Sequence, residues 1–266
     1  MRGAFGGAAL AAGFVISTSA EAAPLRVMSL DQCGDQYVLA LSPDATLALS
    51  PRADDPDSWM KAQAAGRRRI RPTLEAAIAF RPDVVVRYWG GEPRLLAALE
   101  RRGITVLTID DATTMQGVHD NITRVADGLG QRQRGAHLSA SMQGRLAKAS
   151  PGTSDSNSSA LYLTPGGFTA GTGTLIDAVL KAAGFSNLAT SPGFAPVSVE
   201  RVALSPPRRF VLGFFDLFRS DWRGPGRHPV MQRASDGRVA AKLPAAVLTC
   251  PAWFAADAAV MVSQGQ

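Results

Sequence analysis

The sequence predicts an α/β protein built from two similar units, and three observations support this fold class. Short apolar runs alternate with helical segments over residues 24–112, which indicates a parallel sheet covered by helices. A second α/β pattern occupies residues 151–266 and begins with a polar linker. Between the two patterns, residues 113–150 carry apolar positions at helical spacing. We therefore expect two lobes, each with a central sheet, separated by a long helical segment.

Residues 1–23 are predicted to be a secretory signal peptide. Arg2 gives a positive start, and residues 3–16 are small and apolar. An A-x-A cleavage site follows at Ala20-Glu21-Ala22, so the mature chain should begin at Ala23 or Pro24. The apolar run is shorter than the roughly 20 residues that a membrane span needs. These features predict export to the periplasm.

Residues 24–112 are expected to form the first lobe. The V-V-V run at residues 84–86 predicts a strand buried in a parallel sheet. Leu95, Leu96 and Leu99 share one face of a helix that Gly103 ends. Strands are expected at residues 25–30, 46–50, 84–88 and 104–109, and helices at residues 35–41, 72–80 and 93–102.

The helical segment and the second lobe follow. Gly128, Gly130 and Gly135 predict a break or kink within residues 114–149. A Gly-rich loop is expected at residues 165–173, and a short loop-like region at residues 216–237. Strands are expected at residues 160–163, 210–215 and 246–249, and helices at residues 175–183, 198–204 and 255–263.

Charge and motif content exclude several functions. The net charge is +6, but the one dense Arg cluster, at residues 67–71, has no aromatic residues beside it, which argues against nucleic acid. Gly171-Thr172-Gly173 lacks the third glycine of a dinucleotide loop, and no G-x-S-x-G elbow occurs. Only three histidines are present, and His119 and His137 fall in the helical segment. We expect no protein-held metal, no cofactor and no enzyme activity.

Several segments, taken in their order and spacing, resemble the class III substrate-binding proteins of ABC importers for iron-siderophores and cobalamin. The resemblance implies two Rossmann-like lobes joined by a rigid interdomain helix, with the ligand in a cleft between them. It also implies a monomer that delivers a metal chelate to membrane permease subunits. The segments are residues 26–41, 74–86, 95–109, 175–189 and 198–206.

The loops after the strands are the expected ligand contacts, because ligands of open α/β sheets lie outside the carboxyl ends of the strands. Trp89 precedes a Gly-Gly turn, as in cobalamin-binding members, and its ring can pack on a macrocycle or cap the lobe's own core. Trp253 and Phe254 offer a similar surface, or they anchor the last helix. The candidate ligand-binding residues are Asp31, Gln32, Cys33, Arg52, Tyr88, Trp89, Phe168, Trp253 and Phe254.

Two ligand classes and one further function remain open. A ferric siderophore is expected first, and it would be held by basic groups such as Arg52. Cobalamin or another corrinoid is the alternative, and it would be held by aromatic and backbone contacts. A chelatase-like cleft enzyme would need a general base, for which only Asp31, Asp35 and Asp216 lie near the expected cleft. For docking to the permease, the resemblance points to Glu92 on the first lobe and Asp221 on the second.

Cys33 and Cys250 are the only cysteines, and both are expected at the edge of the cleft, one on each lobe. Three interpretations remain open at this point. They are buried free thiols, ligands of a metal, or partners in a disulfide, which the oxidising periplasm would permit.

Overall fold

The computed structural model describes residues 23–149, 159–217 and 223–265 of the 266-residue chain. Residues 1–22 of the predicted signal peptide, with the cleavage site at residues 20–22, lie outside the described residues, as does Asp221. Within the described part of the chain, no helix combines the length and the apolar character needed to cross a membrane.

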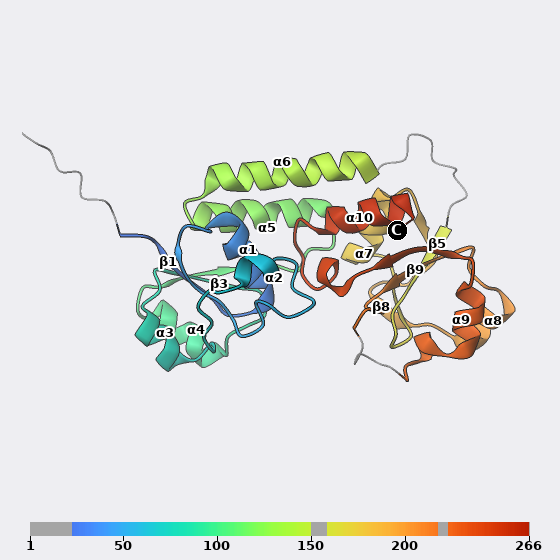
Figure 1. Ribbon diagram of the computed structural model, residues 1–266, viewed down its shortest axis with the longest axis horizontal. Helices are drawn as coiled ribbons and strands as arrows, with labels where there is room; N and C mark the ends of the chain where they lie inside the picture. Colours follow the sequence, from blue (N-terminus) through green and yellow to red (C-terminus); the bar gives the residue numbers. More distant parts are fainter. Residues whose placement is uncertain (1–22, 150–158, 218–222, 266) are drawn as a thin grey trace, which may run out of the picture.

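The first lobe contains a parallel four-stranded sheet in the order β2-β1-β3-β4 (Figure 1). Its strands match the predicted ones closely, because each is a short apolar run bounded by Pro, Gly or Asp. The first helix begins at Gln32, three residues earlier than expected, since the Asp31 side chain caps it by accepting from the backbone N–H of Gly34 at 2.8 Å. The elements are β1 (Arg26–Ser29), α1 (Gln32–Leu41), β2 (Thr46–Ala48), α2 (Lys61–Ala64), α3 (Leu74–Phe80), β3 (Val84–Arg87), α4 (Pro93–Glu100) and β4 (Thr105–Thr108).

The predicted helical segment consists of two helices, α5 (Met115–Gly128) and α6 (Arg132–Ala149). The break expected from the glycines is confirmed as a tight turn in which Gly130 has a positive φ of 67°. The two helices pack side by side, and α6 extends from above the first lobe toward the second (Figure 1). The connection between the lobes is therefore a helix pair, in which α5 packs on the first lobe and α6 also packs along α10.

The second lobe has a parallel sheet in the order β10-β9-β5-β7 and a separate antiparallel pair, β6-β8. The strand expected at residues 246–249 is wrong. Those residues belong to a buried 3-10 turn and its following bend, because Pro244 ends the preceding strand, which the sequence interpretation missed. The elements are β5 (Ser159–Leu163), β6 (Phe168–Ala170), α7 (Leu175–Ala182), β7 (Ser186–Asn187), β8 (Phe194–Pro196), α8 (Val199–Leu204), β9 (Arg209–Gly213), η1 (Pro225–Arg227), α9 (Pro229–Ser235), β10 (Val239–Leu243), η2 (Ala245–Val247) and α10 (Ala255–Gln264).

Two further segments of the second lobe differ from expectation. The Gly-rich loop at residues 165–173 contains a short strand, β6. This strand pairs antiparallel with β8, and Phe168 lies opposite Pro196. The region at residues 216–237 contains η1 and α9, whose N-terminus carries Pro229 at its first helical position. Both elements are short, so their apolar periodicity is too brief to distinguish them from loops.

The largest buried cluster of the described residues runs through both lobes. It joins Val27 and Tyr37 of the first lobe to Val211 and Leu243 of the second through the helix pair and the start of α10. A continuous apolar core across the junction restricts motion of one lobe against the other, because repacking it would expose apolar surface to water.

Candidate functional site

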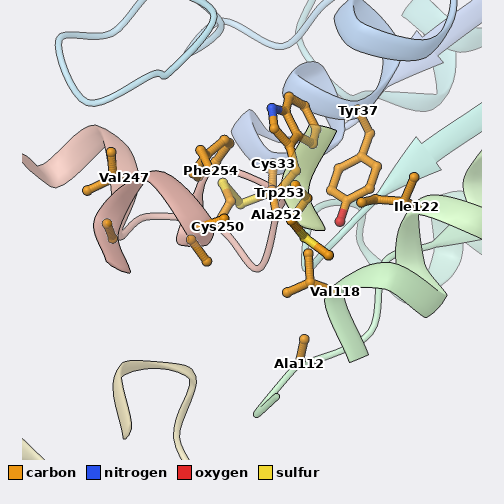
Figure 2. Close-up of a cluster of buried hydrophobic side chains, with 14 of the residues drawn as sticks. Cys33, Tyr37, Ala112, Val118, Ile122, Val247, Cys250, Ala252, Trp253 and Phe254 are labelled. Atoms are coloured by element: carbon orange, nitrogen blue, oxygen red, sulfur yellow. A yellow bond between two sulfur atoms is a disulfide. The ribbon is translucent and has the colours of Figure 1, made fainter. Parts of the chain in front are cut away.

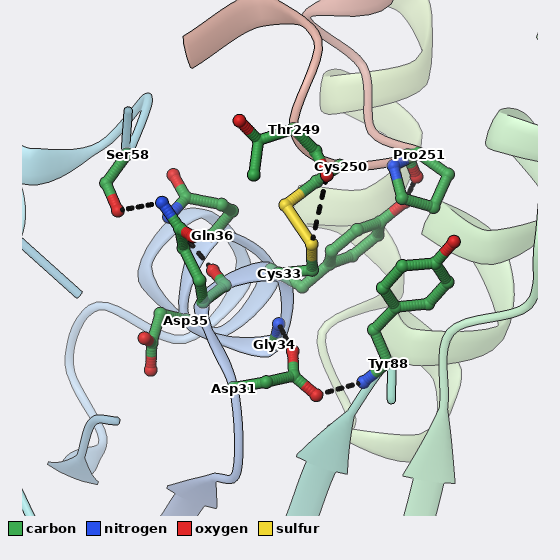
Figure 3. The surroundings of a disulfide bond; sticks show 12 residues. Asp31, Cys33, Gly34, Asp35, Gln36, Ser58, Tyr88, Thr249, Cys250 and Pro251 are labelled. Carbon is green, nitrogen blue, oxygen red and sulfur yellow. Dashed lines mark hydrogen bonds between the residues drawn. A yellow bond between two sulfur atoms is a disulfide. The ribbon is translucent and has the colours of Figure 1, made fainter. Parts of the chain in front are cut away.

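The first-lobe sheet reverses its strand order between β1 and β3, and the chain segments that follow these two strands meet there. The Asp31 carboxylate, just after β1, accepts from the backbone N–H of Tyr88 at 2.6 Å (Figure 3). It also accepts from the backbone N–H of Gly90 at 2.7 Å. Its other oxygen caps α1. Asp31 was expected to contact ligand, but its oxygens are used to hold the loop that follows β3.

This loop needs glycine at two successive positions. A Cβ on Gly90 would lie 2.5 Å from the carbonyl oxygen of Leu30, and Gly91 has a φ of +91°. Because the turn is so tight, the side chain of the preceding Trp89 projects outward and is 72% exposed. The structure therefore displays the indole of Trp89 on a rigid turn, outside the core of its lobe.

Tyr88 is half-buried beside Trp89, with the two ring centroids 5.6 Å apart. Its hydroxyl donates to the carboxylate of Asp111, which follows β4. Burial, together with this hydrogen bond, raises the pKa of the Tyr88 phenol to about 12. The phenol is therefore a neutral hydrogen-bond donor at physiological pH.

Cys33 and Cys250 form a disulfide, with their Cα atoms 5.4 Å apart (Figure 3). The bond joins the first turn of α1 to the segment between η2 and α10, so it links the two lobes directly. Close by, the buried Tyr37 hydroxyl donates to the carbonyl oxygen of Pro251 at 2.8 Å. Of the three interpretations left open for the cysteines, the structure therefore shows the disulfide.

Trp253 and Phe254 were expected in the cleft, and the structure corrects this expectation. They are 4% and 0% exposed and belong to the core at the junction of the lobes (Figure 2). Trp253 meets the ring of Tyr37 edge-on at 5.5 Å, and Phe254 packs on Trp59 at 5.4 Å. Their apolar surface is used to anchor the second lobe on the first, which leaves none for a ligand.

A cavity of about 430 Å³ lies between the lobes, and we call it the interlobe cleft. Its first-lobe wall comes from the loops after β3 and β4, its second-lobe wall from α7 and β8, and its floor from the segment that carries Cys250. Volumes of this order are usual for sites that bind small molecules. The lining residues are Tyr88, Trp89, Asp111, Ala112, Thr113, Gly173, Thr174, Leu175, Ile176, Val179, Gly193, Phe194, Val247, Leu248, Thr249, Cys250, Pro251 and Ala255.

Phe194 is the aromatic cleft residue that sequence reasoning missed. It begins β8 and is 69% exposed, so the cleft has one exposed aromatic ring from each lobe, Trp89 and Phe194. A signal was present, since Phe194 directly follows Gly193, which has a positive φ, in the stretch S-P-G-F-A-P. The predicted Phe168 is also half exposed, but it does not line the cleft.

Two other predicted residues bond within the first lobe and do not reach the cleft. Buried Gln32 donates to the Ser58 hydroxyl at 2.9 Å. Arg52 pairs with Asp55 at 2.8 Å and with Asp57 at 3.3 Å. The guanidinium of Arg52 is therefore already neutralised by two carboxylates and lines no part of the cleft.

The lining of the interlobe cleft is almost uncharged. No Lys, Arg or His belongs to it among the described residues, and Asp111 is its one carboxylate. Over the same residues, no three His, Cys, Asp or Glu side chains are grouped so as to hold a metal ion. The remaining polar side chains are the neutral hydroxyls of Tyr88, Thr113, Thr174 and Thr249. The cleft can therefore offer aromatic stacking and neutral hydrogen bonds.

The candidate docking residue Glu92 is not among the residues that line the cleft. It precedes α4 and is exposed, and its side chain makes no capping hydrogen bond. Its carboxylate is therefore accessible at the surface of the first lobe.

Comparisons with known proteins agree with this architecture. The family model described as periplasmic binding protein matches residues 29–211. The cobalamin-binding proteins of two Halobacterium salinarum strains are 27% identical over 199 residues, which cover 71% of this chain and 54% of theirs. The chain thus spans about half the length of the curated relatives it matches.

Solved structures share the fold over nearly the whole chain. A possible iron-binding periplasmic protein of Staphylococcus epidermidis superposes with a TM-score of 0.70 at 15% identity, covering 91% of this chain and 98% of that one. A periplasmic heme-binding protein of Pseudomonas aeruginosa gives 0.57 at 25%, covering 85% and 86%. The periplasmic vitamin B12 binding protein of Vibrio cholerae gives 0.61 at 20%, covering 91% and 96%. From its family match over residues 29–211, its two parallel-sheet lobes and the helix pair that joins them, the chain belongs to the family of periplasmic binding proteins.

Proposed function

We propose that this protein is the extracytoplasmic receptor of an ABC importer and that its ligand is a corrinoid such as cobalamin. The observation that carries the proposal is the interlobe cleft with Trp89 and Phe194 exposed on opposite lobes and no cationic side chain among its described lining residues. Flat aromatic rings pack well on the faces and edges of a large macrocycle. The 27% identity to a cobalamin-binding protein supports the same ligand class.

The geometry favours a corrinoid over the ferric siderophore that was expected first. Anionic siderophores are held by cationic groups, since a guanidinium forks onto pairs of oxygens. Arg52 was the residue expected to do this, and it is paired with Asp55 and Asp57 instead. A corrinoid carries neutral amide groups around an apolar ring, so it needs hydroxyls and backbone groups more than it needs Arg or Lys.

In this proposal, the chain is exported by its N-terminal segment and works as a monomer in the periplasm. The loaded receptor docks on the permease through exposed carboxylates, for which Glu92 is the first-lobe candidate. Asp221 is the candidate on the second lobe. The metal reaches the protein inside its chelator, as cargo, so the protein itself acts as a carrier and catalyses no reaction.

A ligand panel tests the proposal. The mature chain, starting at Ala23, is titrated with cyanocobalamin, dicyanocobinamide, hemin and ferrichrome, and binding is followed by quenching of tryptophan fluorescence and by equilibrium dialysis. We expect saturable binding of the two corrinoids at a stoichiometry of one. Binding of ferrichrome or hemin with no binding of either corrinoid would rule out the assignment.

A further inference from the structure

The interlobe cleft has one charged side chain among its described lining residues, the carboxylate of Asp111. We propose that Asp111 is a specificity-determining residue that selects a macrocycle with carboxamides on its rim over one with carboxylates. This inference rests on the proposed corrinoid function and deepens it. It concerns which substituents the cleft accepts around the ring.

Asp111 is held in place but keeps a free acceptor. The Tyr88 hydroxyl donates to its Oδ1 atom, which fixes the side chain against the wall of the cleft. No described group donates to Oδ2. The side chain is also exposed to the cleft, so a ligand N–H can reach it.

The neighbouring Asp110 has a cationic partner, whereas Asp111 has none among the described residues. Asp110 forms an ion pair with Arg124, with a nitrogen–oxygen distance of 2.7 Å. Among the described residues, no Lys or Arg lies within ion-pair distance of Asp111. The negative charge of Asp111 is therefore uncompensated and acts on whatever enters the cleft.

The chemistry of this arrangement discriminates between ligand substituents. A carboxamide donates N–H to the free oxygen in a charge-assisted hydrogen bond. A carboxylate at the same place can only repel Asp111, and apolar walls strengthen that repulsion because they exclude screening water. The Thr113 hydroxyl also lines the cleft and can bond a neutral amide as well. The Thr174 and Thr249 hydroxyls already donate to backbone carbonyls within the second lobe.

The experiment uses two probes with the same cobalt macrocycle. Dicyanocobinamide carries side-chain amides, and dicyano-cobyrinic acid carries side-chain carboxylates. The affinities of both for the mature chain are measured by equilibrium dialysis at pH 8, where the ligand carboxylates are ionised. We expect wild type to prefer the amide form by at least about tenfold. Asp111→Asn should reduce that ratio by about tenfold, mainly through tighter binding of the carboxylate form.

Asp110→Asn is the matched control, since it makes the same charge change one residue away, outside the lining of the cleft. We expect the control to keep the wild-type ratio. An Asp111→Asn variant that keeps the wild-type ratio while dicyanocobinamide still binds would overturn the role of Asp111 alone. Failure of both corrinoids to bind wild type would overturn the proposed function instead.

A second measurement needs no variant. Repulsion between the ligand and an uncompensated carboxylate weakens as salt is added. Raising the salt concentration from about 0.05 M to about 0.5 M should therefore narrow the wild-type ratio between the two probes. A ratio that does not change with salt would contradict the electrostatic selection.

Discussion

At the residue scale, four aromatic side chains separate into two roles. Trp89 and Phe194 are exposed in the interlobe cleft, whereas Trp253 and Phe254 are buried at the junction of the lobes. All four are large and apolar, so their type alone does not assign the role. The tight turn at Gly90-Gly91 pushes Trp89 outward, and the segment after Cys250 carries Trp253 into the core.

Replacing Trp89 with alanine should weaken corrinoid binding without unfolding the protein. Loss of an aromatic contact in a desolvated site typically costs about 1–3 kcal/mol of binding free energy. Fluorescence titration with cyanocobalamin measures the change, and circular dichroism verifies the fold. Phe168→Ala is the control, since Phe168 is an exposed aromatic residue outside the cleft. Equal affinities of wild type and Trp89→Ala would remove Trp89 from the site.

The buried carboxyl group of Asp35 should make the stability of the protein depend on pH. It is fully buried, and its carboxylate accepts from the Ser50 hydroxyl at 2.6 Å and from the Ser50 N–H at 2.8 Å. Burial raises the pKa of Asp35 from 3.8 to about 6, and the hydrogen bonds only partly oppose it. As the pH is lowered, the Asp35 carboxyl therefore binds its proton at a higher pH in the folded state than in the unfolded state. The contribution of Asp35 to stability consequently grows as pH falls from 7 toward 4.

The comparison of wild type with Asp35→Asn isolates this contribution, because asparagine keeps the shape and cannot titrate. The stability of wild type relative to the variant should rise by about 2 kcal/mol between pH 7 and pH 4, because the pKa is raised by about two units in the folded state. Urea unfolding at a series of pH values measures the difference. Parallel stability curves for the two proteins would contradict the prediction.

At the scale of elements, the segment from Thr249 to Phe254 has three attachments to the first lobe. These are the disulfide to Cys33, the hydrogen bond from Tyr37 to Pro251, and the packing of Trp253 and Phe254. Thr249, Cys250 and Pro251 also form the floor of the interlobe cleft. The same segment therefore contributes both to the cleft and to the contact between the lobes.

The disulfide should contribute strongly to stability. It closes a loop with a sequence separation of 217, for which the loss of chain entropy in the unfolded state gives about 5 kcal/mol, less any strain. The double variant Cys33→Ser, Cys250→Ser should therefore unfold at a lower urea concentration than oxidised wild type. A thiol assay on denatured, unreduced protein from the periplasm should detect no free thiols. Two free thiols per chain would show that the bond does not form there.

Trp253→Ala should reduce the stability of the protein and leave ligand affinity nearly unchanged, the reverse of what is expected for Trp89→Ala. Removing a fully packed aromatic ring leaves a cavity, and such changes cost about 3–5 kcal/mol of stability. Since Trp253 is 4% exposed and does not line the cleft, affinity should change little under conditions where the variant is folded. Urea unfolding and ligand titration of both variants test the contrast. A large loss of affinity with unchanged stability in Trp253→Ala would show that Trp253 contacts the ligand, which would contradict this prediction.

At the scale of the whole molecule, the two lobes are joined by a helix pair, a disulfide and a continuous core, which together restrict their relative motion. In the proposed function, such a frame would present much the same surface to the permease with and without ligand, and exposed charges would then contribute to docking. Glu92 is exposed and makes no capping hydrogen bond, which is compatible with such a role.

Reversing the charge at Glu92 should reduce uptake and leave ligand affinity unchanged. Glu92→Arg replaces an attraction to cationic permease groups with a repulsion, and like charges at an interface are strongly unfavourable. Uptake of labelled cyanocobalamin by cells that carry the variant measures transport, and equilibrium dialysis measures binding. Glu75→Arg, on the first helical turn of α3, serves as a control for surface charge. Normal uptake by the Glu92 variant would exclude this carboxylate from docking.

Much of the fold was predictable because local patterns specify it. The apolar runs and their Pro and Gly boundaries placed β1 to β4, and the glycines at residues 128–135 predicted the break between α5 and α6. Short elements such as β6 and α9 were missed, since a few residues carry too little periodicity to separate a strand or helix from a loop. The sequence left open whether Trp89 is exposed or caps the core of its lobe, and the structure shows it exposed beside the Gly90-Gly91 turn.

Whether each of the other aromatic residues is buried or exposed depended on contacts between distant parts of the chain. The chain alone left open whether Cys33 and Cys250 are joined, and their separation of 217 positions is bridged only when both lobes have folded. The same docking buries Trp253 and leaves Phe194 exposed across the cleft. Local sequence determines the backbone pattern because it acts through neighbouring residues, whereas burial depends on which distant surfaces come together. The tertiary structure therefore decided which aromatic residues remain available to a ligand.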